Sequence, residues 1–398
     1  MKVSVSSSCL SGVLSAITSK SYAHRSMICD FMLSNPLMIE NLTKSQDILA
    51  TYNALTAIRN GERVLDAGES GSTLRFLIPL VATLKGDFQI KTHGKLGERP
   101  NDDLFNAING KTLNAYTKDG VVYVNGLLTA GHYEIRADKS SQYLSGLIMA
   151  LSGLEEKSTV KVLTPISSSP YVDITVNVLK SFGFNVEFKN DTFIVGGKRQ
   201  SALNPIIEGD WSNSAFFLVA GVINGDITVK NLNQKSVQGD RVIVDIIKSA
   251  GGDITAHGDD ITAKKSTLKG FTMNAENCPD LVPICAVLGA YSNGITTITN
   301  VKRLKLKESD RIVSTLCMLK SVGVKCEEIN DSIIIHGGEV FGGEIDSFND
   351  HRIAMASAIL ALNAKGDIKI TGANSVNKSY PNFYLDFNKL GGKAIEIV

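Results

Sequence analysis

Residues 178–188 read VLKSFGFNVEF, an apolar helical pattern that stops at Gly183 and runs directly into a strand-like segment. Helices often end in this way, because glycine takes the left-handed conformation of a C-cap without a steric penalty. The same pattern occurs at four other glycines, Gly110, Gly251, Gly323 and Gly391. In chain order the five glycines are separated by 73, 68, 72 and 68 residues. This regular spacing indicates an internal repeat of helix and strand.

A shorter copy, TAIRNGERVL, surrounds Gly61. A second series of segments interleaves with the first, and each opens with small or capping residues and then becomes apolar almost all round. These segments begin at Ser19, Gly71, Ser140, Ser212, Pro279 and Asn349. A helix that is apolar on every side is buried, so we expect these to be inner helices and the glycine-terminated ones to lie outside.

Six repeats fill the chain, because its 398 residues divide into units of about 66. Alternation of helix and strand within each unit predicts an α/β fold. No long linker interrupts the series. Two domains of three units each would have ordinary domain sizes.

Composition excludes several kinds of partner. Lys and Arg number 41 against 40 Asp and Glu, so the overall charge gives no reason to expect nucleic acid or an acidic membrane. The six cysteines show no CxxC spacing, as in proteins of the reducing cytoplasm. The first residues lack a signal-peptide core, and the apolar runs are far shorter than the ~20 residues that span a bilayer. We therefore expect a cytoplasmic protein without a membrane anchor.

Polar and charged side chains gather at the starts of the expected inner helices. They are Lys20, Ser21 and Arg25 at the first, Ser140, Ser141 and Gln142 at the third, and Asp280, His351 and Arg352 at later ones. The unpaired N–H groups of a helix start attract phosphate and carboxylate. For any single one of these residues, a structural role in capping or in a core ion pair explains its presence as well as an anion site does. Their recurrence at equivalent points of separate repeats favours an anion site.

The segment LKLKESDRI, residues 304–312, crowds both signs of charge before another apolar helix. A solvated helix start capped by Asp310 explains it, and so does a site for an anionic substrate. Only the rest of the chain distinguishes these interpretations.

Nine motifs, in order along nearly the whole chain, resemble the 5-enolpyruvylshikimate-3-phosphate synthase family. They are SKSYAHR from Ser19, GESGSTLR from Gly68, GERP from Gly97, SSQYLS from Ser140, SPYVDIT from Ser169, GDWSNSAFF from Gly209, KESDR from Lys307, NDHRIAM from Asn349 and NKSYPNF from Asn377. The resemblance implies transfer of an enolpyruvyl group from phosphoenolpyruvate to the 5-hydroxyl of shikimate 3-phosphate, with release of phosphate, on the route to aromatic amino acids. It implies no cofactor, no metal and a monomeric enzyme.

The resemblance also implies a two-domain inverted α/β barrel with six folding units, three per domain. Its first strand joins the C-terminal half. One domain is then expected at residues 1–18 with 210–398 and the other at 19–209, with the active site in the cleft between them.

The resemblance assigns roles to individual residues. Asp280 and Glu308 match the catalytic base and acid, and Lys20 matches a group that assists proton transfer. The residues that match phosphoenolpyruvate contacts are Lys20, Gly71, Arg99, Gln142, Arg311, Arg352 and Lys378. Those that match the shikimate 3-phosphate side are Ser21, Arg25, Ser140, Ser141, Gln142, Ser168, Asp280 and Lys307. Basic side chains suit this task, because two anionic substrates must be brought together against their repulsion.

Four positions depart from the family pattern: Glu69, Arg303, Lys305 and Ser169. The departures at Glu69 and in the segment with Arg303 and Lys305 bear on substrate affinity more than on the type of reaction. Two alternative functions remain open. A UDP-N-acetylglucosamine enolpyruvyl transferase shares the fold, but it typically carries a reactive cysteine on a loop of the first domain, where HGKLGERPNDD (residues 93–103) has none. A non-catalytic anion-binding or scaffold protein is the second alternative.

Overall fold

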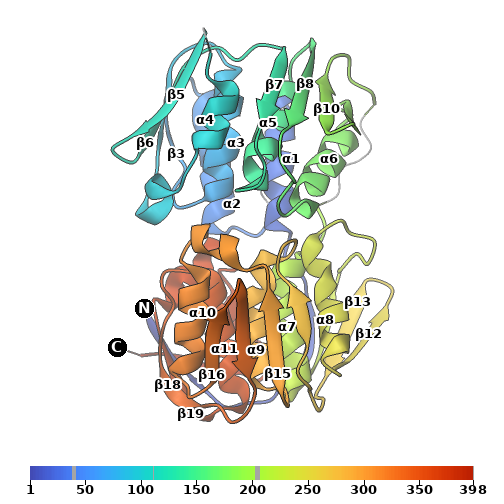
Figure 1. The fold of residues 1–398 in the computed structure, drawn as a ribbon, viewed down its shortest axis with the longest axis vertical. Coiled ribbons are helices and arrows are strands. Elements are labelled where there is room, and N and C mark those ends of the chain that lie inside the picture. The colour runs from blue at the N-terminus through green and yellow to red at the C-terminus, as the bar shows by residue number, and fades with distance from the viewer. Residues whose placement is uncertain (38–41, 111, 202–206, 398) are drawn as a thin grey trace. The chain divides into compact units, whose positions relative to one another are not determined.

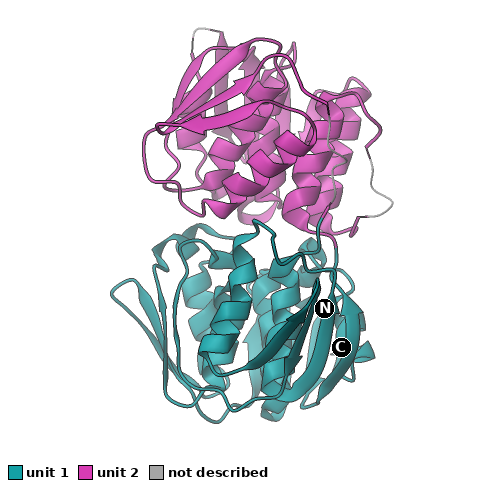
Figure 2. Ribbon diagram, turned by 90° about the vertical axis from the view of Figure 1, so that its right-hand side faces the viewer, with its two compact units in different colours: residues 1–17, 208–398 teal, residues 18–207 magenta. Residues whose placement is uncertain are grey.

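The computed structural model describes residues 1–397 except 38–41, 111 and 202–206 (Figure 1). The chain forms two compact units. Unit 1 contains residues 1–17 and 208–398, and unit 2 contains residues 18–207 (Figure 2). The boundaries implied by the family resemblance, after residues 18 and 209, differ from these by one and two residues.

Unit 1 contains both ends of the chain. Its strands are β1 (Lys2–Ser6), β2 (Leu10–Ser15), β11 (Gly225–Lys230), β12 (Asp253–His257), β13 (Asp260–Lys264), β14 (Thr272–Asn274), β15 (Ile295–Thr299), β16 (Lys325–Ile329), β17 (Ser332–His336), β18 (Phe341–Asp346), β19 (Lys365–Thr371) and β20 (Lys393–Ile397). Its α-helices are α7 (Trp211–Asn224), α8 (Ile243–Ser249), α9 (Val282–Ala290), α10 (Arg311–Lys320), α11 (His351–Leu360) and α12 (Phe383–Lys389). Short 3-10 helices are η2 (Gly239–Val242), η3 (Pro279–Leu281), η4 (Lys302–Leu306), η5 (Ala361–Asn363) and η6 (Ala373–Lys378).

Unit 2 is built from the same kinds of element. Its helices are α1 (Lys20–Met32), α2 (Gln46–Arg59), α3 (Gly71–Ala82), η1 (Gly94–Glu98), α4 (Asp102–Ile108), α5 (Ser141–Ser152) and α6 (Pro170–Ser181). Its strands are β3 (Val64–Asp66), β4 (Phe88–Lys91), β5 (Leu113–Lys118), β6 (Val121–Gly126), β7 (His132–Ile135), β8 (Lys157–Val162), β9 (Val186–Lys189) and β10 (Thr192–Gly196).

The described residues form five four-stranded sheets with one common topology. The strand orders are β3-β4-β6-β5, β7-β8-β10-β9, β2-β11-β13-β12, β14-β15-β17-β16 and β18-β19-β1-β20. In every sheet the first two strands are parallel and the other two pairings are antiparallel. A parallel pair needs a crossover helix, and here the inner helix provides it. The fold is therefore a repeated α/β unit, as the sequence predicts.

The last sheet joins the two ends of the chain. In this sheet β1 pairs with β20 in antiparallel orientation, and Val3 lies opposite Glu396. The next strand, β2, pairs in parallel with β11, so that Gly12 lies opposite Ile227. The N-terminal strands thus complete two sheets of unit 1.

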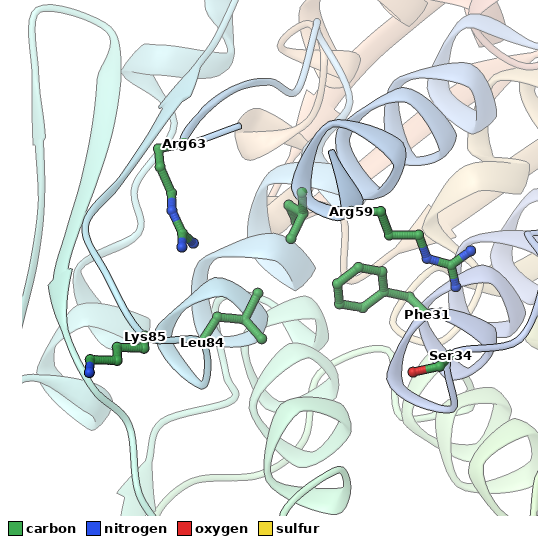
Figure 3. Close-up of a pocket in the computed structure, with 7 residues that line it drawn as sticks. Phe31, Ser34, Arg59, Arg63, Leu84 and Lys85 are labelled. Atoms are coloured by element: carbon green, nitrogen blue, oxygen red, sulfur yellow. The ribbon is translucent and has the colours of Figure 1, made fainter. Parts of the chain in front are cut away.

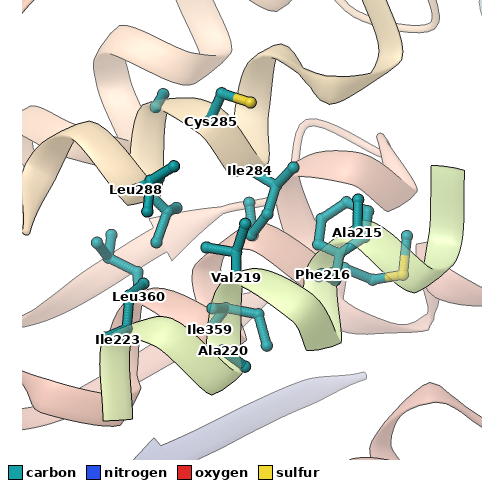
Figure 4. Packing of buried hydrophobic residues seen from close by; sticks show 14 of the residues in the cluster. Ala215, Phe216, Val219, Ala220, Ile223, Ile284, Cys285, Leu288, Ile359 and Leu360 are labelled. Carbon is teal, nitrogen blue, oxygen red and sulfur yellow. The ribbon is translucent and has the colours of Figure 1, made fainter. Parts of the chain in front are cut away.

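Inner and outer helices differ in burial, as predicted. In α7 every residue from Trp211 to Ile223 is buried, and α9 is buried along its whole length. The outer helix α10 instead buries one side, with Val313 exposed. Helices α7, α9 and α11 pack together through apolar side chains such as Phe216, Ile284 and Ile359 (Figure 4). This packing forms the core of unit 1. None of the helices in the described part of the chain has the length and apolar character needed to cross a membrane.

The glycines that decide the repeat behave as predicted with one exception. Gly61, Gly183, Gly251, Gly323 and Gly391 all have positive φ, between 80° and 101°. Gly110 is not among the residues with positive φ. The helix before it, α4, ends at Ile108 and is followed by extended Asn109, whose side chain bonds the backbone N–H and C=O of Ala115. Asn388 makes the same two bonds with Ala394 at the repeat of Gly391, so these bonds tie helix end to strand in both repeats, and only the backbone at Gly110 differs.

The repeat around Gly61 is shorter in structure as well as in sequence. Outer helix α2 ends at Arg59, and the chain then enters β3, which pairs with β4 of the following repeat. In the described residues this unit consists of α1 and α2 without a sheet of its own.

Candidate active site

Arg311 stands at the first position of α10, and the local sequence holds it there. The side chain of Asp310 accepts hydrogen bonds from the backbone N–H groups of Ile312 and Val313, at 3.1 and 3.2 Å. Asp310 is thus the N-cap, as the simpler interpretation of LKLKESDRI proposes. The hydroxyl of Ser309 donates to Asp350 Oδ2 at 3.1 Å.

Three carboxylates surround the buried guanidinium of Arg311, which is 1% exposed. Its Nη1 donates to Asp280 Oδ1 at 2.7 Å, its Nη2 to Glu308 Oε2 at 2.6 Å, and its Nε to Asp350 Oδ2 at 2.8 Å. Burial alone would lower the pKa of Arg311, but the three carboxylates outweigh it and raise the pKa well above its usual value. The predicted base and acid therefore share one guanidinium.

Asp280 is the centre of a larger cluster of charges. Its Oδ2 accepts from Arg352 Nη2 at 3.2 Å, and its Oδ1 lies 3.4 Å from Lys307 Nζ. Burial lowers the pKa of Lys307, and Asp280 opposes this effect. Asp280 lies within the 3-10 turn η3, which begins at Pro279, and its side chain remains 20% exposed. A carboxylate that is both held and accessible suits proton transfer.

The start of α11 contributes a second basic group. Asp350 caps this helix by accepting from the N–H of Arg352 at 2.9 Å. Nε and Nη1 of Arg352 are buried and have no hydrogen-bond partner among the described residues. Lys378, which is 5% exposed, donates to the carbonyl oxygen of Asn349 at 2.6 Å. The segment from Asn349 to Arg352 thus links two of the predicted phosphoenolpyruvate contacts.

Asp240 joins this group, although its sequence context, SVQGDR, gave no signal. It is buried in η2, and burial, followed by the nearby charge of Asp280, raises its pKa to about 7. Arg352 opposes this shift. A carboxyl that titrates near neutrality next to the predicted base has the properties of an active-site group.

In unit 2, the first two turns of α1 carry Lys20, Ser21 and Arg25. Lys20 Nζ forms an ion pair with Asp47 Oδ2 at 2.7 Å, and both side chains are mostly buried. Arg25 donates to Thr175 Oγ1 at 2.6 Å, to the carbonyl oxygen of Ser21 at 2.8 Å and to that of Tyr171 at 3.0 Å. Burial lowers the pKa of Arg25 to about 10. Arg25 therefore ties α1 to α6.

A second set in unit 2 surrounds the start of α3. A Cβ added to Gly71 would lie 2.8 Å from Nη1 of Arg99, so the absence of a side chain lets this arginine approach the helix start. Gln142 lies in the same set: its Oε1 accepts from Arg75 Nη1 at 2.6 Å, and its Nε2 donates to Ser72 Oγ at 3.0 Å. Nε of Arg99 is buried and lacks a partner among the described residues.

The predicted serines stand at helix starts. Ser140 caps α5 by accepting from the N–H of Gln142 at 3.3 Å, and buried Ser141 is the first residue of that helix. Ser168 precedes α6 with a φ of 52°, a conformation that serine rarely adopts. Strained backbone of this kind is concentrated at functional sites.

Three of the departures from the family pattern have local contacts: Arg303, Lys305 and Glu69. Arg303 Nη2 donates to the carbonyl oxygen of Glu276 at 3.1 Å, and Lys305 Nζ lies 3.2 Å from Glu328 Oε1. Glu69 packs over Gly94, where a Cβ would lie 2.8 Å from its Oε2. The glutamates beside Arg303 and Lys305 reduce the net charge that each presents to a neighbouring ligand.

Sequence reasoning missed four residues that the structure places beside the predicted ones: Asp47, Arg75, Asp240 and Asp350. Arg75 and Asp350 lie inside the quoted motifs GESGSTLR and NDHRIAM. A search for charge partners of the predicted cations would have found Asp350, whereas Arg75 is itself a cation and contacts the predicted Gln142. Asp47 and Asp240 lie outside the motifs.

Comparison with known proteins identifies the family of the chain. Residues 56–387 match the model of a family described as EPSP synthase (3-phosphoshikimate 1-carboxyvinyltransferase). Proteins named 3-phosphoshikimate 1-carboxyvinyltransferase from Clostridium acetobutylicum and Clostridium kluyveri are each 38% identical, and the matches cover 99% of this chain and 98% of theirs.

Solved structures show the same fold. An EPSP synthase from Acinetobacter baumannii superposes with a TM-score of 0.78 at 25% identity, covering 99% of this chain and 100% of that one. The enolpyruvyl transferase NikO from Streptomyces tendae has a TM-score of 0.79 over 99% of this chain and 98% of its own, at 16% identity, and so shares the architecture. Similarity of this extent in both sequence and structure shows that the chain belongs to the EPSP synthase (3-phosphoshikimate 1-carboxyvinyltransferase) family.

Proposed function

We propose that this enzyme transfers the enolpyruvyl (carboxyvinyl) group of phosphoenolpyruvate to the 5-hydroxyl of shikimate 3-phosphate, in the shikimate pathway to aromatic amino acids, and that the clusters described above carry out the transfer. Family membership supports the reaction. One observation supports the choice of residues: Asp280 and Glu308 lie on the two terminal nitrogens of one buried guanidinium, that of Arg311. Two carboxylates held this close together can act on neighbouring atoms of one intermediate.

The reaction needs a base and an acid. Asp280 removes the proton of the attacking 5-hydroxyl as the hydroxyl oxygen bonds to C2 of phosphoenolpyruvate, and Glu308, which enters this step protonated, donates its proton to the methylene carbon, C3. The product is a tetrahedral intermediate with a methyl group. Glu308 then takes back a methyl proton, which re-forms the double bond as the C2–O bond to phosphate breaks. Asp280 passes the hydroxyl proton to the departing phosphate, so both carboxyl groups return to their starting states.

The phosphoenolpyruvate contacts in this proposal are Lys20, Gly71, Arg99, Gln142, Arg311, Arg352 and Lys378. Arg352 is well suited, because two of its guanidinium nitrogens are buried without a partner among the described residues. Arg311 has all three nitrogens engaged by carboxylates. We therefore propose that Arg311 mainly orients Asp280 and Glu308 and contacts phosphoenolpyruvate by exchanging one of these partners. Lys20, paired with Asp47, assists proton transfer.

The shikimate 3-phosphate contacts are Ser21, Arg25, Ser140, Ser141, Gln142, Ser168, Asp280 and Lys307. Serine hydroxyls at helix starts donate to phosphate without adding charge. Arg25 bonds residues of α6, so its role includes holding Ser168 and the start of that helix in position. Two sets of residues on separate units are proposed to act on one pair of substrates.

A phosphate-release assay tests the assignment. The protein is incubated with phosphoenolpyruvate and either shikimate 3-phosphate or UDP-N-acetylglucosamine, and phosphate is measured. Release with shikimate 3-phosphate alone is expected. Release only with the sugar nucleotide would assign the alternative transferase, and release with neither acceptor would leave a binding protein without catalysis.

The assembly and the compartment belong to the same proposal. The six cysteines are all free in the structure, as in proteins of a reducing compartment. We propose a monomer that acts in the cytoplasm on small anionic substrates. Gel filtration with light scattering would give the mass in solution, for which 42.7 kDa is expected.

A further inference from the structure

Helix α1 differs from the other inner helices in what covers it. In unit 2, α3 packs against β4 and β6, and α5 packs against β8 and β10. The main partners of α1 are the helices α2 and α6. The sequence explains this difference, because the chain passes from Gly61 directly into β3 without the strand pair that follows the outer helices α4 and α6. Within the described residues, the C-terminal part of α1 is left without a sheet.

A cavity of about 640 Å³ lies at this place, which is well within the size range of small-molecule sites. Its lining residues are Phe31, Ser34, Ile58, Arg59, Arg63, Leu84 and Lys85 (Figure 3). Three are half-buried apolar side chains, three are basic, and none is acidic. In Figure 3, Arg63 and Lys85 lie on one side of Leu84, and Phe31 with Arg59 lies on the other.

Arg59 has a structural role at this cavity. Its Nη2 donates to the carbonyl oxygens of Asn35 and Asp30, which follow or end α1, and its guanidinium lies 5.6 Å from the centre of the Phe31 ring. A cation at the C-terminal end of a helix stabilises the last carbonyl groups. These contacts explain the position of the Arg59 side chain without a ligand.

Arg63 and Lys85 are exposed and do not cap a helix in this way. The Arg63 guanidinium stacks over the Phe88 ring at 4.5 Å, which holds it in place without using its N–H donors. Among the described residues, the side chains of Arg63 and Lys85 form no hydrogen bond or ion pair. Two cations without counter-charges therefore border the apolar surface made by Leu84, Ile58 and Phe31.

We propose that this cavity binds a small organic carboxylate with an apolar body. The carboxylate pairs with Arg63 and Lys85, and the apolar body lies across Leu84 and Ile58 towards Phe31. An inorganic anion would leave the apolar surface in water, and a neutral hydrocarbon would desolvate the two cations without pairing them. Only a ligand that combines both parts satisfies the whole cavity. The site uses none of the residues assigned to enolpyruvyl transfer.

Titration calorimetry with 3-phenylpropionate tests the proposal, with the uncharged 3-phenylpropan-1-ol and inorganic phosphate as comparison ligands. The double variant Arg63→Gln/Lys85→Gln is expected to weaken binding of 3-phenylpropionate at least about tenfold, because both charge-assisted contacts are lost. Leu84→Ser should weaken it as well, through loss of apolar contact. Both changes lie at exposed or half-buried positions, so both variants should fold, and circular dichroism checks this.

A matched control removes the same charge elsewhere. Arg241→Gln/Lys248→Gln changes two exposed cations of unit 1 and should leave the affinity unchanged. Equal affinity in the two double variants, equal binding of the alcohol, or no binding by the wild type would overturn the proposal. Binding of phosphate as tight as that of 3-phenylpropionate would overturn the apolar part of the site. Failure of the proposed transferase function would instead appear as absence of phosphate release, which this titration does not measure.

Discussion

Oδ1 of Asp280 lies 2.7 Å from Nη1 of Arg311, inside a cluster where one guanidinium holds three carboxylates. Arg311 is almost wholly buried, whereas Asp280 remains a fifth exposed. The pair therefore joins a fixed buried cation to a carboxylate that substrate can reach. This geometry fixes the position of the proposed base before substrate arrives, and such preorganisation lowers the cost of reaching the transition state.

Arg311→Lys should impair both stability and catalysis. Lysine keeps the charge but lacks the planar fork, so it cannot hold three carboxylates at once. Loss of partners for buried charges should lower the free energy of unfolding of unit 1 by on the order of 3 kcal/mol. The single tryptophan, Trp211, is buried in this unit, so its fluorescence during urea unfolding measures the effect. Arg241→Lys, at an exposed site, is the control. Unchanged unfolding and unchanged kcat would show that the cluster is dispensable.

Asp280→Asn and Glu308→Gln should separate the two proton transfers. Each variant keeps a hydrogen-bond acceptor for Arg311 while removing an ionisable group, and a loss in kcat of about 10²-fold or more is expected for each. Glu308→Gln should in addition slow the uptake of solvent deuterium into the methylene group of phosphoenolpyruvate. Asp310→Asn, which alters the cap of α10 but not the cluster, serves as the comparison. Equal deuterium uptake in wild type and Glu308→Gln would rule out Glu308 as the acid.

Much of the fold could be predicted from local sequence patterns. Glycines such as Gly183 mark helix ends, because the chain takes a positive φ there, which glycine adopts readily. The helix from Trp211 onward is apolar on nearly every side, and this pattern predicts an inner, buried position. Gly110 shows where this reasoning fails. Its helix ends in extended Asn109, whereas the same pair of bonds from an asparagine to an alanine accompanies a left-handed glycine at Gly391, so the local sequence does not distinguish the two endings.

The candidate site was predictable as a set of cations but not as a set of contacts. The motif KESDR identified Glu308 and Arg311, yet the bond from Arg311 to Asp350 joins residues 39 positions apart. Such pairings depend on how repeats pack, which local pattern does not encode. For the same reason Asp240 was missed, because its raised pKa arises from burial and from Asp280, which lies in another repeat.

Gly71→Ala should weaken phosphoenolpyruvate binding more than folding. The added Cβ would lie 2.8 Å from Arg99 Nη1, the far end of a flexible side chain, so the arginine moves and the helix remains. A rise in KM for phosphoenolpyruvate of about tenfold is expected, with KM for shikimate 3-phosphate little changed. Gly146→Ala is a contrasting variant, because its Cβ would lie 2.4 Å from the carbonyl oxygen of Arg75 and should impair folding. Equal KM values for phosphoenolpyruvate in wild type and Gly71→Ala would show that Gly71 does not contribute to the phosphoenolpyruvate site.

The stability of unit 1 should fall as the pH rises from about 4 to about 7, because of Asp240. Burial, and then the charge of Asp280, raises the pKa of this carboxyl from 3.8 to about 7. A group with a higher pKa in the folded chain binds its proton more tightly there, so its contribution is fully present below the unfolded pKa and is lost as pH rises through the folded pKa. The slope from one such group is at most about 1.4 kcal/mol per pH unit.

Asp240→Asn cannot ionise, so its free energy of unfolding relative to wild type should increase over this range and level off above it. Asp245→Asn, at an exposed position of α8, should show no such trend. Urea unfolding followed by Trp211 fluorescence across the range measures the difference, and parallel pH profiles for wild type and Asp240→Asn would exclude Asp240 as the titrating group.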